Sequence, residues 1–568
     1  MNTQVSQKIE KISGAQMVVQ CLKRLGVDTI FGYPGGAILP VYDALYNSGI
    51  HHVLTRHEQA AIHAAEGYAR ATGKVGTVMA TSGPGATNLV TGIADAFMDS
   101  VPVVIITGQV ATSMLGTDGF QEADVLGITL PVTKYSYQPH DPSEIPKIIH
   151  EAYHLASTGR PGPVLIDIPK DVLNSIAEFH IPETIEFAGY QVIEEPDQQQ
   201  IATIAQAIDK AKRPLLYIGG GIIHAEAAQE LRLFAKKANI PVVSTLMGLG
   251  AFEPDDPLYL GMLGMHGTYA ANMAVYECDL LIACGVRFDD RVTGKLERFS
   301  PNSKKVHIDI DPAEIGKNVV IDYPLVCDVK KALAQLLLHS PKPDTGAWIS
   351  KVTQRAKEYP LKYEQHPDGG LKPQFVIDYL SKLTDGKAIV TTEVGQHQMW
   401  AAHFYQVRQP RSFITSGGLG TMGFGFPAAM GAQLAKPDAT VVCIAGDASF
   451  QMNIQELQTI AEFNIPVKVF VINNHFLGMV RQWQEIFYDN RYSESKIGSP
   501  DFVKVAEAFN VKGLRAATKA EAEMAIREAL AHPGPVVVDF NVEEEENVFP
   551  MVPPGKGNDE MILGGWEE

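Results

Sequence analysis

The chain has 568 residues, 45% of them hydrophobic and 20% charged, a composition typical of a globular protein with roughly three or four domains. Its net charge of 47 − 65 = −18 argues against a partner that is a nucleic acid or an anionic membrane. No apolar run is long enough to predict a membrane span, and residues 1–11 do not resemble a secretory signal. The five cysteines lack metal-like spacing, so we expect reduced structural thiols in a cytoplasmic protein.

Apolar strands alternate with helical patterns in three modules, which predicts an α/β protein with mainly parallel, doubly wound sheets. Residues 100–104, 239–243 and 464–467 share one pattern, in which a helix ends, a proline stops it and an apolar strand starts. Residues 161–167 are echoed by residues 533–539, so we expect the first and third modules to share a topology. Polar linkers separate the modules, and the sequence leaves open whether the tail after Asn541 is mobile or folds over a site.

In the first module, a predicted strand at residues 29–31 leads into a glycine-rich turn that contains Gly36. A second strand, at residues 52–54, leads to a helix that has Glu58 in its first turn. A carboxylate at this position commonly complements the helix dipole. The functional alternative is a carboxyl group held in an apolar pocket, where its pKa is raised.

In the third module, a predicted strand at residues 441–444 leads to Gly446 and Asp447, and a helical pattern follows through residue 460. The next strand, at residues 467–472, ends just before Asn474, which is 474 − 447 = 27 positions after Asp447. Ligands gather at such strand ends in open α/β sheets. Carboxylate and amide oxygens suit Mg²⁺, and the glycine allows a phosphate to approach the backbone. The residues predict a magnesium and diphosphate site, with an ordinary βαβ unit as the alternative.

This spacing resembles the signature of thiamine-diphosphate enzymes, although Ala448 replaces the usual glycine. Residues 56–61, 81–88, 116–122, 394–398, 416–423 and 478–484 further resemble the acetohydroxyacid synthases, also called acetolactate synthases. The resemblance runs in order from about residue 12 to about residue 550, and it is to the large catalytic subunit.

The resemblance implies a pyrimidine-binding domain at residues 1–190, a Rossmann-like FAD domain at 196–342, a diphosphate- and magnesium-binding domain at 370–545 and a tail at 546–568. It also implies three cofactors, which are thiamine diphosphate, Mg²⁺ and an FAD that does no net redox work. The expected substrates are pyruvate and 2-ketobutyrate, and the expected products are precursors of valine, leucine and isoleucine. A homodimer or tetramer and a small regulatory subunit are the implied partners.

Each site residue takes its expected role from the matching position in the family. Glu58 matches the glutamate that bonds the aminopyrimidine ring, and Met422 matches the apolar residue that keeps the cofactor bent. Asp447, Asn474 and the carbonyl of Phe476 match the magnesium ligands. The other thiamine-diphosphate positions are Val394, Gly395, Gln396, His397, Gly420, Gly446, Ala448, Ser449, Gly478 and Met479. In the family, the glutamate and the metal site come from different subunits.

The middle module resembles the FAD-contacting segments of the biosynthetic enzymes, and arginine forks suit the FAD diphosphate. The matching positions are Gly219, Gly220, Gly221, Met265, His266, Gly267, Gly285, Arg287, Asp290, Arg291 and Asp309, and Arg160 of the first module matches another FAD contact. The implied catalytic and substrate positions are Gly36, Gln121, Lys134, Met479 and Trp483, with Met265, Arg287 and Asp290 from the middle module. Trp483 matches a residue that favours 2-ketobutyrate, because packing one extra methyl group is worth roughly 1–3 kcal/mol.

Three alternatives compete with this interpretation. A pyruvate oxidase-like oxidoreductase would use the same cofactors with a redox-active FAD, but residues 287–291 and Trp483 favour the synthase. A degradative acetolactate synthase would lack FAD. A non-catalytic partner is disfavoured because Glu58, Asp447 and Asn474 are all present.

Overall fold

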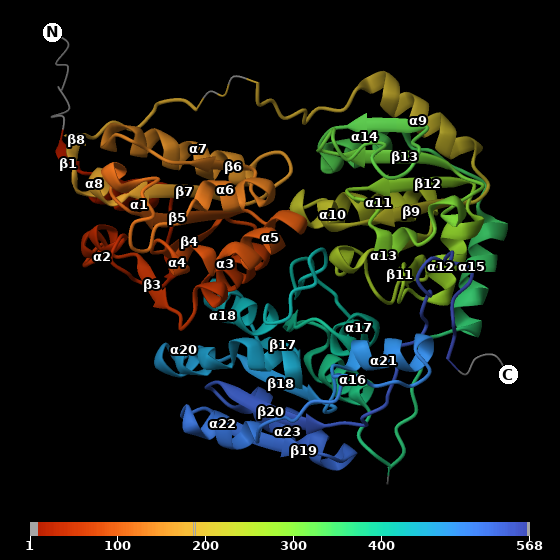
Figure 1. Cartoon of the computed structure of the whole chain (residues 1–568). Helices are drawn as coiled ribbons and strands as arrows, with labels where there is room; N and C mark the ends of the chain where they lie inside the picture. Colours follow the sequence, from red (N-terminus) through yellow and green to blue (C-terminus); the bar gives the residue numbers. More distant parts are fainter. Residues whose placement is uncertain (1–9, 186, 188, 368, 565–568) are drawn as a thin grey trace. The chain divides into compact units, whose positions relative to one another are not determined.

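The structure is a computed structural model, and it describes residues 10–185, 187, 189–367 and 369–564. The start of the expected N-terminal domain, residues 1–9, and the end of the expected tail, residues 565–568, lie outside the described residues. The chain forms two compact units (Figure 1). Unit 1 contains residues 1–191, 418–438 and 452–467, and unit 2 contains residues 192–417, 439–451 and 468–568.

A six-stranded parallel sheet forms the core of unit 1, in the order β3-β2-β4-β5-β7-β6. Successive side chains of a strand point to opposite faces, so the apolar strands bury both faces of the sheet under helices. The strands are β2 (Thr29–Gly32), β3 (His51–Leu54), β4 (Gly76–Ala80), β5 (Val103–Gln109), β6 (Tyr135–Tyr137) and β7 (Val164–Pro169). One face carries α1 (Gly14–Arg24), α2 (Leu39–Leu45), α7 (Ile145–Ser157) and α8 (Lys170–Asn174), and the other carries α3 (Glu58–Thr72) and α5 (Val90–Met98).

Two further features complete unit 1. β1 (Lys11–Ser13) and β8 (Ile176–Glu178) form a separate antiparallel pair. Helix α18 (Gly425–Ala435) packs against α3 so closely that only glycine fits at two crossing points. A methyl group on Gly67 would lie 2.0 Å from the carbonyl oxygen of Ala428, and one on Gly431 would lie 1.8 Å from that of Ala64.

The first sheet of unit 2 is also parallel and six-stranded, in the order β11-β10-β9-β12-β13-β14. Numbered along the chain, this order is 3-2-1-4-5-6, the strand order of the Rossmann fold. The strands are β9 (Pro214–Ile218), β10 (Val242–Ser244), β11 (Tyr259–Met262), β12 (Leu280–Cys284), β13 (Lys304–Asp309) and β14 (Tyr323–Val326). Its faces are covered by α9 (Gln198–Lys210), α10 (Gly220–His224), α11 (Ala228–Ala238) and α14 (Val329–His339) on one side, and by α12 (Tyr269–Glu277) and α15 (Gly346–Glu358) on the other.

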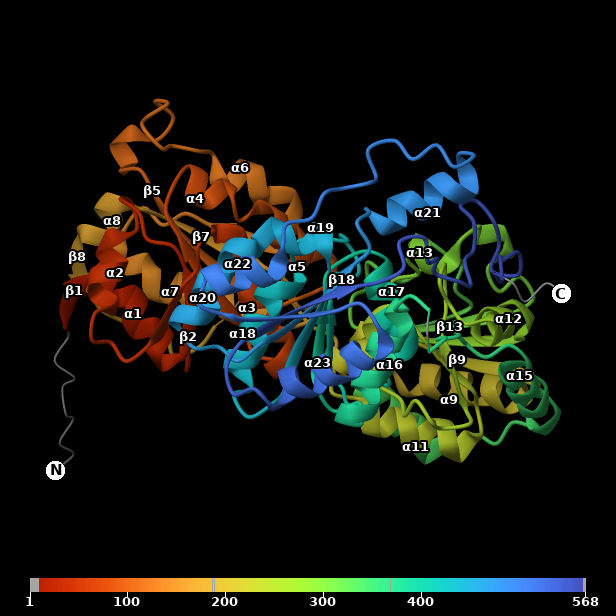
Figure 2. The ribbon, with the colours of Figure 1, turned by 90° about the horizontal axis from the view of Figure 1, so that it is seen from below.

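The second sheet of unit 2 has the order β16-β15-β17-β18-β20-β19 and is parallel throughout. Its strands are β15 (Ile389–Thr392), β16 (Phe413–Thr415), β17 (Val441–Gly446), β18 (Lys468–Asn473), β19 (Lys512–Ala516) and β20 (Val536–Asn541). Helices α16 (Pro373–Thr384), α17 (Gln396–Phe404) and α23 (Lys519–Ala531) share its buried apolar cluster, and Figure 2 shows α16 beside α23. Three parallel α/β sheets confirm the predicted fold class.

The N-terminal and C-terminal sheets have the same topology, as the sequence echo predicts. In each, the strands follow the order second, first, third, fourth, sixth, fifth along the chain. The echoed segments at residues 161–167 and 533–539 lead into β7 and β20, which are the sixth strands of their sheets. The shared topology is therefore confirmed.

The repeated helix-proline-strand pattern is one local structure used three times. Ser100, Asn239 and Asn464 each follow a helix and have positive φ angles of 59°, 52° and 50°. In each case the next residue donates its N–H to the carbonyl five positions earlier, at 2.8, 3.0 and 2.9 Å, and this bond closes the helix end. The proline that follows cannot continue the helix, so the chain turns into the next strand.

The helix predicted through residue 460 is not continuous. A short helix, α19 (Asp447–Phe450), is followed by a 3₁₀ segment, Gln451–Glu456, and then by α20 (Leu457–Glu462). Asn453 has a non-helical φ of −130°, and its side chain donates to the carbonyl of Gly423 at 2.6 Å. The side-chain bond holds Asn453 at this break in the helix, so the prediction of one continuous helix is wrong. No helix in the described part of the chain is both long and apolar enough for a membrane crossing.

Candidate active site

In unit 1, the predicted residues Gly36, Glu58 and Gln121 follow the carboxyl ends of β2, β3 and β5. Glu58 is the first residue of α3, which begins there because the Nδ1 atom of His57 accepts the N–H of Gln59 at 3.1 Å. Gln121 has a φ of 59° and lies against the turn after β4, where a methyl group on Gly83 would be 2.9 Å from its carbonyl oxygen. Gly36 is exposed at the same edge of the sheet.

Glu58 is buried, with 9% of its surface exposed. Asn88 donates from Nδ2 to its Oε2 atom at 2.9 Å, so one carboxyl oxygen has a fixed partner. Gly85 flanks the other oxygen, and a methyl group there would lie 3.5 Å from Oε1. Burial and the nearby Glu58 carboxylate raise the pKa of the Tyr42 hydroxyl above its usual range. The glutamate thus sits in a largely closed site with one oxygen next to a glycine.

Lys134 and Arg160 lie at the other edge of the same sheet. Lys134 directly precedes β6 and donates from Nζ to the carbonyls of Leu155 and, at 2.9 Å, Thr158. Arg160 precedes β7 and donates from Nε to the Ser100 hydroxyl at 2.8 Å. Within unit 1, the structure therefore does not bring Lys134 together with Glu58.

The predicted positions Gly420 and Met422 also belong to unit 1. The N–H of Gly418 donates to Asp99 at 2.7 Å, and Asn453 holds the carbonyl of Gly423. A methyl group on Gly423 would lie 3.7 Å from the side chain of Gln59. The segment that contains Met422 therefore runs beside the first turn of the helix that Glu58 begins.

In unit 2, Asp447 follows the last residue of β17 and is 1% exposed. The hydroxyl of Ser499 donates to its Oδ2 atom at 2.7 Å. Burial raises the pKa of the Asp447 carboxyl to about 6, while the bond from Ser499 opposes this shift. A buried carboxylate with one neutral partner is a favourable ligand for a divalent cation, which offsets the cost of burying the charge.

Asn474 is the other predicted side-chain ligand, and it follows β18, the neighbour of β17 in the sheet. Its Oδ1 atom accepts the N–H of Phe476 at 3.3 Å, and its Nδ2 atom donates to Gln396 at 3.3 Å. Phe476 is held by a bridge to Lys496. A carboxylate, an amide oxygen and a backbone carbonyl form a hard oxygen donor set, so the residues present fit Mg²⁺.

The predicted diphosphate positions lie at turns where two glycines leave no room for a side chain. A methyl group on Gly446 would lie 2.8 Å from the His397 ring, and one on Gly478 would lie 2.2 Å from Oε1 of Gln396. Burial lowers the pKa of His397 to about 3, and its Nε2 atom has no hydrogen-bond partner in the described part of the chain. The remaining predicted positions here are Val394, Gly395, Ala448, Ser449 and Met479. An orphaned buried nitrogen beside glycines fits a bound ligand such as a diphosphate.

The predicted flavin glycines lie between the two central strands of the Rossmann-like sheet. Gly219, Gly220 and Gly221 follow β9, and Gly285 follows the adjacent β12. The N–H of Gly221 donates to the carbonyl of Gly285 at 3.1 Å, and added methyl groups there would collide with the facing turn. Strand order reverses between β9 and β12, and dinucleotides bind at this point of a doubly wound sheet.

The other flavin positions of unit 2 also cluster at the carboxyl edge of this sheet, whereas Arg160 lies in unit 1. Met265 donates its N–H to the carbonyl of Arg291 at 2.7 Å, which joins the turn after β11 to the turn after β12. His266 is buried, and burial lowers its pKa to about 3. Asp309 ends β13 and accepts the N–H of Asp311 at 2.9 Å. Gly267, Arg287 and Asp290 lie in the same two turns, and a dinucleotide such as FAD fits this arrangement.

Met479 and Trp483 lie on α21 (Gly478–Phe487), one turn apart on the same helix face. The Trp483 ring packs edge-on against Phe487 at 5.6 Å between centroids. The tail after β20 is folded against other parts of unit 2, because Val552 donates its N–H to the carbonyl of Met265 at 2.7 Å. The question that the sequence left open is thus settled for the described tail residues, which are held by hydrogen bonds.

Sequence reasoning missed three residues that hold the predicted ones. Asn88 lies inside a run that carries the family resemblance, and its amide could have been noticed there. Gln482 adjoins Trp483 and bonds Gln396 at 2.9 Å. Ser499 gave no signal, because it lies 52 positions after Asp447 in a segment without a motif.

A group of buried ionisable side chains in unit 1 has no part in the predicted site. Ligand atoms of His63, Glu66 and Asp95 lie within 4.8 Å of one another, a spacing that would suit a metal ion. Arg70 already supplies a positive charge here, 3.6 Å from Glu66 and 2.8 Å from Asp99. His63, Glu66, Arg70, Asp95 and Asp99 therefore form a buried charge cluster.

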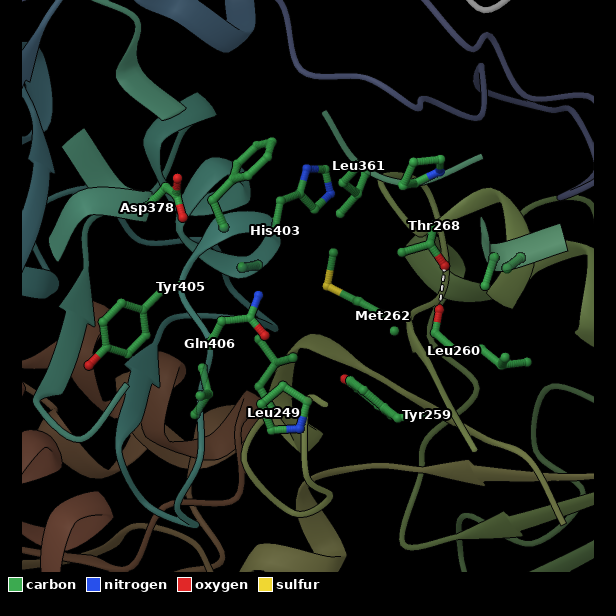
Figure 3. A pocket seen from close by; sticks show the side chains of 18 of the residues that line it. Leu249, Tyr259, Leu260, Met262, Thr268, Leu361, Asp378, His403, Tyr405 and Gln406 are labelled. Carbon is green, nitrogen blue, oxygen red and sulfur yellow. Dashed lines mark hydrogen bonds between the residues drawn. The ribbon is translucent and has the colours of Figure 1, made fainter. Parts of the chain in front are cut away.

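A cavity of about 470 Å³ in unit 2 is separate from the predicted residues, none of which line it (Figure 3). His403 lies at its wall and donates from Nε2 to the carbonyl of His266 at 2.6 Å. Tyr259, Met262 and Gln406 also line the cavity. It adjoins the turn that carries the predicted flavin contacts.

Comparisons with known proteins extend over all three sheets. Residues 12–128, 201–336 and 393–540 match the N-terminal TPP binding domain, the central domain and the C-terminal TPP binding domain of thiamine pyrophosphate enzymes. The chain is 52% identical to the acetolactate synthase large subunit of Parasynechococcus marenigrum over 567 residues, which cover 97% of this chain and 91% of that protein. It is 49% identical to the large subunit of Haemophilus influenzae over 572 residues, or 99% of this chain and 100% of that protein. The large subunit of Cyanidium caldarium is 49% identical over 567 residues, or 97% and 96%.

Proposed function

The chain belongs to the family of acetolactate synthase large subunits, which are thiamine pyrophosphate enzymes, and from this we propose that it joins two 2-keto acids with loss of CO₂. Pyruvate is the donor, and pyruvate or 2-ketobutyrate is the acceptor. The products are 2-acetolactate and 2-aceto-2-hydroxybutyrate, precursors of the branched-chain amino acids. The observation that carries the proposal is the pairing of Asp447 with Asn474 at the ends of adjacent parallel strands, beside a glycine-lined turn.

When bound, thiamine diphosphate would supply the electron sink that decarboxylation of a 2-keto acid needs. Asp447, Asn474 and the Phe476 carbonyl would hold Mg²⁺, and Gln396 and His397 would bind the diphosphate beside it. The low pKa of His397 keeps its ring neutral near pH 7, so it takes part as a hydrogen-bonding group and adds no charge.

Glu58 would hold a proton for the aminopyrimidine ring of the cofactor. Its carboxyl group is buried and has one oxygen occupied by Asn88, which leaves the other for the ligand. Met422 would support the bent cofactor from the segment beside α3. In this family, the glutamate of one subunit and the metal site of another form one active site. We expect the same in a homodimer of this chain.

FAD would occupy the reversal point between β9 and β12, with Arg287 and Arg291 at its diphosphate. Met479 and Trp483 would line the acceptor pocket, together with Gly36 and Gln121. A small regulatory subunit is the expected partner, because the similar proteins are called large subunits. Five free buried cysteines are consistent with a reducing, cytoplasmic location.

Product identification tests the proposal. The purified protein is incubated with pyruvate, thiamine diphosphate, Mg²⁺ and FAD, with and without 2-ketobutyrate. We expect 2-acetolactate from pyruvate alone and 2-aceto-2-hydroxybutyrate when 2-ketobutyrate is present. Formation of acetyl phosphate or peroxide would instead support a pyruvate oxidase-like enzyme, and a colourless protein that forms acetolactate without FAD would support the degradative type.

A further inference from the structure

Gln482 is a fully buried amide on α21 whose two polar atoms are both used. Its Nε2 atom donates to the carbonyl of Val548 at 2.9 Å. Its Oε1 atom accepts two bonds, one from the N–H of Val548 at 2.9 Å and one from Nε2 of Gln396 at 2.9 Å. The Gln482 side chain thus bonds both the N–H and the carbonyl of Val548 in the tail. It also bonds Gln396, which borders the predicted diphosphate site.

Gln396 extends this set of bonds into the site. Its Nε2 atom also donates to the carbonyl of Glu546 at 2.9 Å, and its Oε1 atom accepts from Asn474 at 3.3 Å. A continuous hydrogen-bonded path therefore runs from a predicted magnesium ligand, through two glutamines, to the backbone of the tail. Every member is buried or part-buried, so a missing partner would leave a polar group without water.

Arg481 adds a second anchor from the same helix face. Its guanidinium is fully buried and donates to the carbonyl of Glu546 at 2.8 Å and to the side chain of Asn547 at 2.6 Å. Arg481 also pairs with Glu485, one turn further on. The spacing of a helix places residues 481, 482 and 485 on one face and Met479 and Trp483 on another. Helix α21 therefore binds the tail on one side and carries the predicted substrate residues on the other.

We propose that Gln482 is a positioning residue for the cofactor site, and that it makes the tail backbone at Val548 a structural part of that site. Gln482 fixes the side chain of Gln396, which in turn orients the amide of Asn474 toward the metal. It also sets the position of α21, and with it Met479 and Trp483. This inference rests on the proposed function, because it assigns cofactor binding to Gln396 and Asn474.

The test compares Gln482→Met with the wild-type protein. Methionine has nearly the same length, so it removes these three hydrogen bonds, and a longer one to Sδ of Met551 at 3.6 Å, while leaving little empty space. We expect the dissociation constant for thiamine diphosphate, measured by calorimetry with saturating Mg²⁺, to rise about 10- to 100-fold, as for other supporting residues of ligand sites. Hydrogen exchange at the Val548 amide should become faster, because its acceptor is lost. Activity should recover at saturating cofactor.

Gln484→Met is the matched control. Gln484 lies two residues further along the same helix, and its side chain donates to the carbonyl of Ser493 at 2.8 Å, away from the tail. We expect its cofactor affinity and its exchange at Val548 to stay within about twofold of wild type. If Gln482 had a purely structural role, Gln482→Met would lower the melting temperature but would leave the cofactor affinity unchanged.

Gln482→Glu is a second variant that keeps the proposal testable if the methionine variant does not fold. It keeps the acceptor for Val548 and Gln396 but loses the donor to the Val548 carbonyl, so we expect an intermediate loss of affinity. Folded Gln482→Met or Gln482→Glu protein with wild-type affinity and wild-type exchange at Val548 would overturn the inference. Failure of the wild-type protein to bind thiamine diphosphate would instead overturn the proposed function, so the two failures are distinguishable.

Discussion

Glu58 and Asp447 are both buried near the carboxyl ends of strands, and each accepts a hydrogen bond from one neutral side chain. Asn88 donates to Glu58, and Ser499 donates to Asp447. A neutral partner satisfies one oxygen without cancelling the charge, so the other oxygen can serve a ligand. Glu66 differs from both residues, because its carboxyl group lies in a cluster that contains an arginine.

Glu58→Gln tests the proposed proton-holding role. Glutamine keeps an oxygen that can accept from Asn88, but it cannot exchange a proton with the cofactor. We expect turnover with pyruvate to fall about 10²- to 10⁴-fold, together with slower loss of the C2 proton of bound thiamine diphosphate. Acid-quench NMR measures that exchange, and calorimetry checks that the cofactor still binds. Near-normal exchange in the variant would contradict the role of Glu58.

Asp447→Asn tests the proposed metal site. The substitution removes the only carboxylate of the donor set, so Mg²⁺-dependent binding of thiamine diphosphate should weaken by more than about 100-fold. Ser499→Ala is the graded comparison, because it removes only the hydroxyl that orients the carboxylate. We expect a smaller loss, of about tenfold. A titration with Mg²⁺ at fixed cofactor gives both values, and the reverse order of effects would show that Asp447 is not the ligand.

At the scale of elements, the pair of α3 and α18 is the tightest helix contact described here. Gly67 and Gly431 let the backbones of the two helices approach until an added methyl group would overlap a carbonyl oxygen. Because α3 begins with Glu58 and the segment before α18 contains Met422, this contact determines how two predicted site residues are supported within unit 1. Changes in the packing should therefore affect both stability and the site.

Gly431→Ala tests this contact. Its methyl group would lie 1.8 Å from the backbone oxygen of Ala64, which cannot rotate away, so the helices must separate. We expect the free energy of unfolding to fall by about 3 kcal/mol, seen as a lower melting temperature. Gly346→Ala is the control, because an added methyl group there meets nothing within 4 Å at the start of α15. Equal melting temperatures for both variants would contradict the packing argument.

At the scale of the whole molecule, the buried charge cluster makes stability depend on pH. Burial raises the pKa of Glu66 to about 8 from an ordinary value of 4.5, although Arg70 opposes the shift. Between these two pH values the folded protein holds a proton that the unfolded chain has lost. Stability should therefore fall as pH rises through this window, by up to about 1.4 kcal/mol per pH unit from this group.

Glu66→Gln removes this titration and should flatten the dependence of melting temperature on pH between about pH 5 and 8. Calorimetry of the wild type and the variant over this range measures the difference in slope. Glu178→Gln is the control, because Glu178 is exposed on the edge strand β8 and should leave the slope unchanged. Parallel curves for Glu66→Gln and the wild type would show that Glu66 does not hold the proton.

Much of the fold can be predicted from patterns within short segments of the chain. Apolar runs predict the strands, and the helix-proline-strand pattern places three helix ends at Ser100, Asn239 and Asn464. The echo of residues 161–167 at 533–539 predicts that two sheets share a topology, which the strand orders confirm. Parallel strands bring their carboxyl ends to one edge, so the positions of Asp447 and Asn474 also follow from the sequence.

Local sequence patterns therefore suffice to predict strands such as β2, β17 and β18, to within two residues at their ends, and the side chains that follow them, because these features depend on residues close together in the chain. Only the tertiary structure decided the partners of those side chains, such as Asn88 for Glu58, Ser499 for Asp447 and Val548 for Gln482. The break in the helix at Asn453, whose side chain bonds the distant carbonyl of Gly423, also appears only in the tertiary structure. These partners lie 30 or more positions apart, and packing alone brings them within hydrogen-bonding distance.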